Sequence, residues 1–182
     1  MRPLLTTKRF ELKEIVASDQ QFIYEGLSHP EVIPFYGVRY QSFEATKAQM
    51  EFYDSMIKEG TGQWWKVVNK NTEEKVGAIG YNNYSKQHNK AEVGYWLLPA
   101  YWKKGIVSEV FPVIIDHLFN EKKVHRIEAL VEEGNTDSNR LLERVGFIYE
   151  GTMRDCEIKD DKHISLRIYS LLATDKLLSI SE

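Results

Sequence analysis

Apolar side chains recur along the chain with two different periods, and each period predicts its own kind of element. An apolar residue at every second position is typical of a strand, because successive strand side chains point to opposite faces. A spacing of three to four residues is typical of an amphipathic helix. The first pattern predicts strands over 6–15, 63–68, 75–84, 91–98, 124–131, 147–158 and 164–172, and the second predicts helices over 17–27, 42–60, 106–119 and 137–145.

The helical stripe is strongest over 106–119. Its apolar members fall on one face of a helix and are Val107, Val110, Phe111, Ile114, Ile115 and Leu118. Pro112 stands inside the segment, so a lost backbone hydrogen bond and a kink are expected there. Polar residues suggest where the other helices begin and end. Ser18 or Asp19 is the expected N-cap of the first helix, Ser42 that of the second, and Gly146 follows the last.

The order of the elements indicates the fold class. Antiparallel hairpins come first, a strand–helix–strand unit follows over 91–131, and a last hairpin closes around 159–163. Such a crossover joins two parallel strands. We therefore predict an α/β (α+β) fold, in which a mixed central sheet contains one βαβ core and is flanked by helices. Because the 182 residues show no linker or repeat, a single domain over 1–182 is expected.

Composition and charge narrow the class of protein. The chain is 42% hydrophobic and 28% charged with a net charge of −3, so nucleic acid and anionic membranes are not expected partners. Cys156 is the single cysteine, and no apolar stretch is long enough for a signal peptide core or a membrane span. A cytoplasmic protein is expected. The histidines lack ligand spacing, so no metal site is expected either.

The stretch "YWKKGIVSEV", residues 101–110, precedes the strong helical stripe and has two interpretations. The start of a helix in a βαβ unit offers free N–H groups and a favourable dipole to a phosphate. Lys103 and Lys104 add positive charge, Gly105 allows close approach, and Ser108 offers a hydroxyl. However, neither the Walker pattern nor the dinucleotide fingerprint is present. From these residues alone, a phosphate site and an ordinary helix start both remain open.

Several segments together resemble one family. They are "AEVGYWLLPAYWKKGIVSE", "NTDSNRLLERVGF", "YEGTMR" and "IYSLL", with "LLTTKRFELKEIVASD" at the start. Their order over residues 4–172 is similar to the GNAT family of N-acetyltransferases, and to its branch that acetylates the N-termini of ribosomal proteins. The resemblance implies acetyl-CoA as co-substrate and an amine as acceptor.

The resemblance also implies which residues would bind acetyl-CoA. The family's diphosphate loop falls on residues 102–107, that is Trp102, Lys103, Lys104, Gly105, Ile106 and Val107. The strand end Trp96, Leu97 and Leu98 would pair with the pantetheine arm and present an amide to the thioester oxygen. Asn135 and Asn139 would face the cofactor. Two positions depart from the branch, which usually has Gly at position 103 and Gly or Ala at position 107.

Two further residues match catalytic positions of the family. Ser138 would be the general acid, or a hydrogen-bond donor to the thiolate, and Glu157 the general base. From the residues alone, helix capping is the preferred interpretation of Asn135, Ser138 and Asn139, and Glu157 could equally be a solvated strand carboxylate. A protein α-amine has a pKa of about 8 and is about one tenth neutral at pH 7, so it needs only modest help from a base.

The predicted activity is acetyl transfer from acetyl-CoA directly to an amine. The preferred acceptor is the N-terminal α-amine of a protein, of the ribosomal kind. One alternative acceptor is a small amine such as a polyamine, an amino acid or an antibiotic, and another alternative is a non-catalytic module that binds acyl-CoA. A homodimer is expected because relatives in the branch are often dimers.

Overall fold

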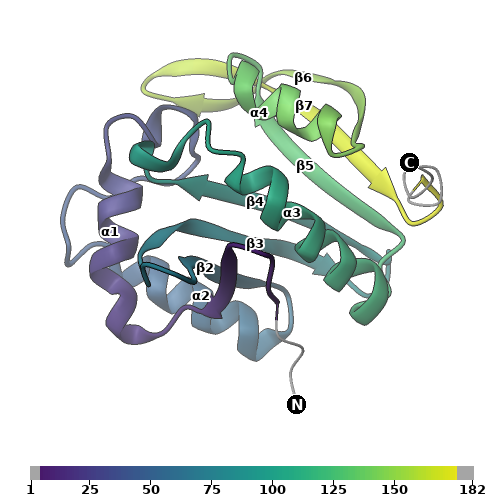
Figure 1. Cartoon of the computed structure of the whole chain (residues 1–182). Coiled ribbons are helices and arrows are strands. Elements are labelled where there is room, and N and C mark those ends of the chain that lie inside the picture. The colour runs from purple at the N-terminus through teal and green to yellow at the C-terminus, as the bar shows by residue number, and fades with distance from the viewer. Residues whose placement is uncertain (1–4, 176–182) are drawn as a thin grey trace.

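The computed structural model describes residues 5–175 and is built on one seven-stranded sheet (Figure 1). The strands lie in the order β1-β2-β3-β4-β5-β7-β6. Their bounds are β1 Phe10–Glu14, β2 Gln63–Asn69, β3 Lys75–Ser85, β4 Lys90–Leu97, β5 Arg126–Glu132, β6 Ile148–Lys159 and β7 Lys162–Leu172. The helices are α1 Gln20–Ser28, α2 Lys47–Glu59, α3 Ile106–Asp116 and α4 Thr136–Arg144. No helix in this part of the chain could cross a membrane.

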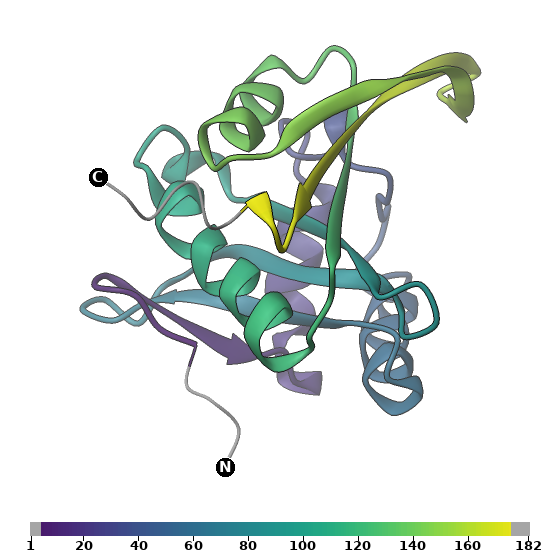
Figure 2. The same cartoon turned by 90° about the vertical axis from the view of Figure 1, so that its right-hand side faces the viewer.

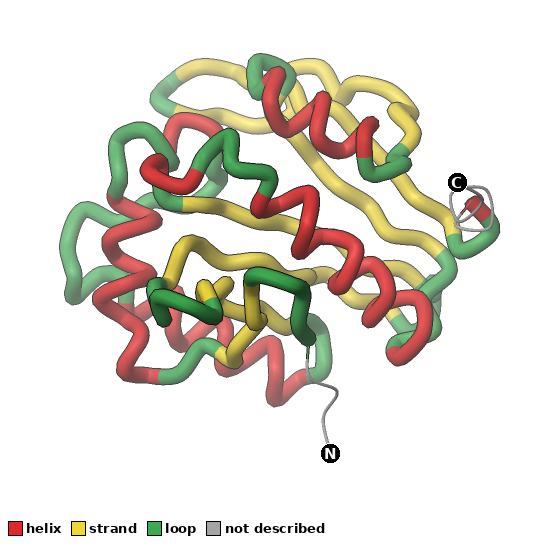
Figure 3. The backbone as a smooth tube through the Cα atoms, in the orientation of Figure 1, coloured by secondary structure: helices red, strands yellow, loops and turns green. Residues whose placement is uncertain are grey.

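The sheet is mixed, as the element order predicted. All neighbouring strands are antiparallel except β4 and β5, which are parallel and are joined by α3. Strand β6 is the edge strand next to β7, and the two form a long hairpin that lies beside α4 in Figure 3. The α/β fold with a βαβ core is therefore confirmed.

Helices cover both faces of the sheet, and each face has its own hydrophobic cluster. Phe111 and Ile114 of α3 pack on one face, while Ile23 of α1 and Met56 of α2 pack on the other. Figure 2 shows α3 and α1 on opposite sides of the central strands. Neighbouring strand residues divide between the two clusters, as alternation requires. The pairs are Trp64 and Trp65, Ala78 and Ile79, and Trp96 and Leu97, whose first members belong to the α1–α2 side.

Three helix boundaries differ from the predicted ones by three residues or more. Helix α1 begins at Gln20, after a 3₁₀ turn over Ala17–Asp19. Helix α2 begins at Lys47, because residues 42–46 form a turn in which the Ala45 N–H donates to the Ser42 hydroxyl oxygen (3.1 Å). Helix α3 ends at Asp116 and continues as a π-helical turn, His117–Glu121, where the Lys122 N–H donates to the His117 carbonyl (3.1 Å). Pro112 lies inside α3, as expected.

Strands β4 and β5 separate soon after they pair. Their register contains only three residue pairs, from Lys90 opposite Arg126 to Glu92 opposite Glu128. Beyond these pairs β4 runs on to Leu97 and β5 to Glu132, and the two strands diverge in Figure 1. The side of β4 that faces β5 therefore has no strand partner over 93–97.

Candidate active site

The loop between β4 and α3 is shaped by two left-handed residues. Lys103 has a φ of 57° and Gly105 a φ of 68°, and Gly105 is the N-cap of α3. The indole N–H of Trp102 donates to the Leu97 carbonyl (2.8 Å) and ties the loop to the end of β4. The first N–H groups of a helix have no partner within it, so this loop presents donors and a positive dipole end.

A cavity of about 600 Å³ opens where this loop, β4 and α4 converge. Helix α3 supplies one wall from its first turn, and α4 supplies the wall opposite. Nine of the residues predicted to bind cofactor or to act in catalysis line this first cavity: Trp96, Leu97, Lys103, Gly105, Ile106, Val107, Ser108, Asn135 and Ser138. Trp102 lines it as well. The predicted loop, strand and α4 residues thus come together in space.

A second cavity, of about 380 Å³, lies beyond the separation of β4 and β5. Val93 and Gly94 of β4 line it, with Ala129–Glu132 of β5 and Glu157 of β6. Five residues line both cavities: Phe35, Tyr36, Tyr95, Asn135 and Ser138. The two cavities therefore meet at Ser138, with Glu157 on the second side only.

A short chain of hydrogen bonds fixes Ser138 at this junction. The Tyr95 hydroxyl donates to Ser138 Oγ (2.8 Å), and the Ser138 N–H donates to Asn135 Oδ1 (3.2 Å). Burial raises the pKa of Tyr95 to about 12, although the bond to Ser138 acts to lower it. The phenol therefore keeps its proton at neutral pH and remains a donor. Ser138 also lies in the first turn of α4, and Asn135 is the N-cap of that helix. The hydrogen bond that caps α4 therefore also holds Ser138 at the junction of the cavities.

Sequence reasoning missed Tyr95. In the alternation of β4 it shares a face with Val93 and Leu97, which gave it the appearance of an ordinary core residue. Its position within the part of β4 that has left β5 is what makes it a site residue. Only the extent of the β4–β5 pairing could have revealed this, and periodicity does not encode it.

Three of the predicted cofactor residues line neither cavity. Leu98 donates its N–H to the Val76 carbonyl (3.0 Å), so that amide is occupied within the sheet. The Lys104 carbonyl accepts from the Arg9 side chain (3.1 Å). Asn139 is buried, and its side-chain N–H₂ donates to the Glu133 carbonyl (3.4 Å). Trp96 contributes to the cavity wall, but its ring packs 5.1 Å from Phe22 on the opposite face of the sheet.

Glu157 is an exposed carboxylate on β6, opposite Ile164 of β7. Its side chain makes no hydrogen bond or ion pair with the described residues, unlike Glu132 across the second cavity, which is paired with Lys159. The register of β6 is irregular between Met153 and Glu157, with Asp155 at a φ of 50°. Among residues 5–175, no group of His, Cys, Asp and Glu side chains could hold a metal ion.

The free N–H groups at the start of α3 suit an anionic group, and the two cavities, which share five lining residues, leave room for two substrates side by side. A family model for the acetyltransferase (GNAT) domain matches residues 9–148. An uncharacterized N-acetyltransferase of Bacillus subtilis, YoaA, is 31% identical over 94% of this chain and 98% of its own. The chain therefore belongs to the GNAT acetyltransferase family, and as an N-acetyltransferase of that family it uses acetyl-CoA as co-substrate.

Two other proteins show the range of the family. A ribosomal-protein-serine acetyltransferase of Escherichia coli is 23% identical over 87% of this chain and 84% of its own. The structure of a Vibrio cholerae spermidine N-acetyltransferase, in complex with CoA and spermine, superposes with a TM-score of 0.83. That protein is 19% identical and is covered over 98% of its length, against 93% of this chain, so this likeness is one of fold.

Proposed function

We propose that the protein acetylates the N-terminal α-amine of a protein, with a ribosomal protein as the first candidate acceptor. The observation that supports this most directly is the pair of cavities that meet at Tyr95, Asn135 and Ser138. In this proposal acetyl-CoA occupies the first cavity, and the acceptor amine enters through the second. The E. coli relative that is named for a ribosomal protein supports the choice of acceptor.

The donor site would use the β4–α3 loop and the free side of β4. The backbone N–H groups at Gly105, Ile106 and Val107, with the Lys103 charge and the Ser108 hydroxyl, would hold the diphosphate. The stretch of β4 that ends at Leu97 would pair with the amides of the pantetheine arm, because it has no strand partner on that side. Leu98, Lys104 and Asn139 would support this site from outside the cavity.

The chemistry requires one new bond, one broken bond and one proton movement. The amine nitrogen attacks the thioester carbonyl carbon, and the carbon–sulfur bond then breaks to release the CoA thiolate. Ser138 would stabilise this thiolate by donating a hydrogen bond to the sulfur, since Ser138 Oγ already accepts the hydrogen of Tyr95. Glu157, on the acceptor side of the junction, would receive the proton that the amine loses.

The second cavity favours a peptide over a polyamine. Its mouth carries large apolar side chains that are exposed to solvent: Phe35 (47%), Val38 (38%), Phe52 (49%) and Ile158 (71%). Of its three carboxylates, Glu132 binds Lys159, whereas Glu92 accepts only from the neutral amide of Asn83 (2.9 Å) and keeps its charge. Glu92 and Glu157 therefore have no cationic partner among the described residues. The ammonium group of a peptide N-terminus would bind one of them while the peptide's side chains contact the apolar residues, whereas a polyamine has no side chain for that contact.

A competition assay separates these acceptors. Spermidine and short peptides with free or blocked N-termini compete for acetyl-CoA turnover by the same enzyme preparation. Preferential use of the free peptides would support the proposal. Preferential use of spermidine would contradict the peptide acceptor and leave the donor site as proposed.

Glu157→Gln tests the proposed base. The variant should lower kcat roughly a hundredfold while acetyl-CoA binding stays the same, because a general base contributes to the chemical step. The control is Asp155→Asn, which neutralises another exposed carboxylate of the same strand that does not line the cavity. Steady-state kinetics and calorimetric titration with acetyl-CoA give the two readouts. A normal kcat in Glu157→Gln would remove this residue from the mechanism.

A further inference from the structure

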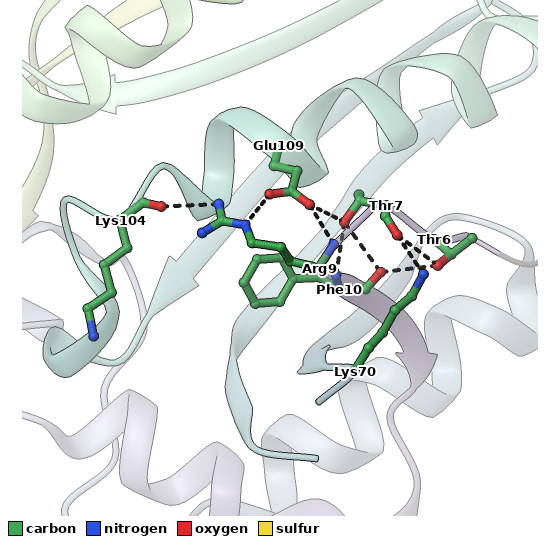
Figure 4. Close-up of polar contacts among 7 residues, drawn as sticks. All are labelled: Thr6, Thr7, Arg9, Phe10, Lys70, Lys104 and Glu109. Atoms are coloured by element: carbon green, nitrogen blue, oxygen red, sulfur yellow. Dashed lines mark hydrogen bonds and ion pairs between the residues drawn. The ribbon is translucent and has the colours of Figure 1, made fainter. Parts of the chain in front are cut away.

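The chain just before β1 is bound to the first turn of α3 (Figure 4). Glu109 of α3 accepts three hydrogen bonds from this segment. The Thr7 hydroxyl (2.6 Å) and the Arg9 backbone N–H (2.9 Å) donate to Oε1, and Arg9 Nε donates to Oε2 (2.5 Å). Segments about a hundred residues apart in sequence are thus joined where α3 begins.

The Arg9 guanidinium makes a second contact, with the loop that precedes α3. Its Nη2 donates to the Lys104 carbonyl (3.1 Å), as Figure 4 shows. In a trans peptide the C=O of one residue and the N–H of the next point in opposite directions. Because the Lys104 carbonyl points toward Arg9, the Gly105 N–H must point away from it. Gly105 lines the first cavity, whereas Arg9 and Lys104 do not.

Arg9 also balances the charge of Glu109. Burial acts to raise the pKa of Glu109, but the hydrogen bonds from Thr7 and Arg9 outweigh it and lower the pKa below its usual value. Glu109 is therefore ionised at neutral pH, within the first turn of the helix whose start faces the cavity. An uncompensated carboxylate there would repel a diphosphate, and the Arg9 guanidinium supplies the compensating charge.

We propose that Arg9, held by Glu109, is a positioning residue for the diphosphate of acetyl-CoA. It fixes the Lys104–Gly105 peptide so that the Gly105 N–H faces the first cavity, and it balances the Glu109 charge in the first turn of α3. Arg9 acts through the backbone of the loop and does not touch the substrate. This inference rests on the proposed placement of acetyl-CoA in the first cavity.

Arg9→Met tests the proposal, because methionine keeps an aliphatic stem over the Phe10 ring, where the guanidinium now lies 5.1 Å from the centroid, and removes the donors. The KM for acetyl-CoA should rise about tenfold with little change in kcat, as expected for one lost charge-assisted hydrogen bond. S-acetylpantetheine, a donor without the diphosphate, is the comparison. Its kcat/KM should fall much less than that of acetyl-CoA.

Two further variants complete the test. Lys70→Met removes a neighbouring hydrogen bond, from Lys70 Nζ to the Thr7 carbonyl (2.5 Å), which involves neither Lys104 nor Glu109. This variant should leave the ratio of kcat/KM for acetyl-CoA to kcat/KM for S-acetylpantetheine unchanged. Arg9→Lys keeps the charge but cannot match the guanidinium fork. It should therefore also affect acetyl-CoA more than S-acetylpantetheine, with a smaller rise in the KM for acetyl-CoA. This milder change also serves if Arg9→Met does not fold.

The outcomes distinguish this inference from the proposed function. A selective loss with acetyl-CoA in the Arg9 variants supports the positioning role. An equal loss with both donors, or no loss with either, overturns it and leaves Arg9 with a role in stability alone. Failure of the unaltered protein to bind acetyl-CoA would instead overturn the proposed placement of the donor.

Discussion

At the scale of single residues, Lys103 shows a conflict between conformation and charge. Its φ of 57° lies in the left-handed region, where a side chain beyond glycine is disfavoured by about 1–2 kcal/mol. The resemblance to the family places Gly at this position, and the backbone geometry explains why. In the proposed donor site, the lysine charge beside the diphosphate offsets this strain. Val107, the other departure, is buried in the core cluster and is thereby accommodated.

Lys103→Gly should therefore separate stability from binding. The variant should raise the free energy of unfolding by up to about 1 kcal/mol, because the left-handed strain is relieved. It should also weaken acetyl-CoA binding, because a positive charge is lost. Lys104→Gly is the matched control: Lys104 has no positive φ, so this change should destabilise the protein. Urea unfolding and calorimetry measure the two effects, and a stability loss in Lys103→Gly would contradict the argument.

The residue scale also shows where sequence reasoning ends. Matching to family motifs identified Asn135 and Ser138, and the structure places both at the junction of the cavities. The same matching pointed to Asn139, which is buried beside Glu133 and lines neither cavity. A motif gives spacing along a helix, but the turn that enters the helix decides which side chains face the cavity. Glu157 remains a prediction, since only its position on the second cavity is known.

At the scale of elements, periodicity predicted the seven strands and the four α-helices of residues 5–175, because alternation and helical stripes report burial directly. The errors are at the ends, where local bonds decide. Asp19, one of two expected N-caps of α1, occupies that position without capping through its side chain. Its buried carboxylate instead accepts from the Val16 N–H (2.9 Å) and contacts Lys66 Nζ of β2 (2.5 Å) and Lys75 Nζ of β3 (2.8 Å). It thus binds the start of α1 to the sheet.

Asp19→Asn should destabilise the protein by about 3–5 kcal/mol, because two lysines lose the charge of a buried partner. Burial acts to raise the pKa of Asp19, but the bonds from Lys66 and Lys75 prevail and lower it. The stabilisation that the ionised Asp19 carboxylate provides is therefore fully present above the pKa of the unfolded state, near 4. It is lost as the pH falls through the lower pKa of Asp19 in the folded protein. Urea midpoints from pH 7 to pH 3 should fall less steeply for the variant. Parallel curves would contradict this role.

At the scale of the whole molecule, the separation of β4 from β5 organises the site. Residues 93–97 leave one side of β4 without a strand partner, and both cavities border this stretch. Element order predicted that β4 and β5 would be parallel neighbours. It could not predict that their pairing stops after three residue pairs, because that depends on the packing of α3, α4 and the β6–β7 hairpin together.

Hydrogen–deuterium exchange can test how acetyl-CoA uses this side of β4. Binding should slow exchange over 93–97 and at the start of α3, because the ligand would accept bonds from amides that have no strand partner. ATP, which lacks the pantetheine arm, should leave 93–97 unchanged. Protection confined to the β6–β7 hairpin would contradict the proposed donor placement.

The same separation has a consequence for how the protein meets other chains. A sheet usually has two edges, and the unpaired backbone groups of each edge strand can pair with a strand of another protein. Here two further edges lie inside the molecule, where β4 and β5 separate, and they border the two cavities. A thin, linear molecule, such as the end of an extended peptide, can reach these inner edges from solution, whereas the sheet edge of another folded protein meets only the outer ones, at β1 and β6. The fold thus leaves the unpaired backbone groups of β4 and β5 open to a ligand and keeps them away from the sheet edges of other proteins.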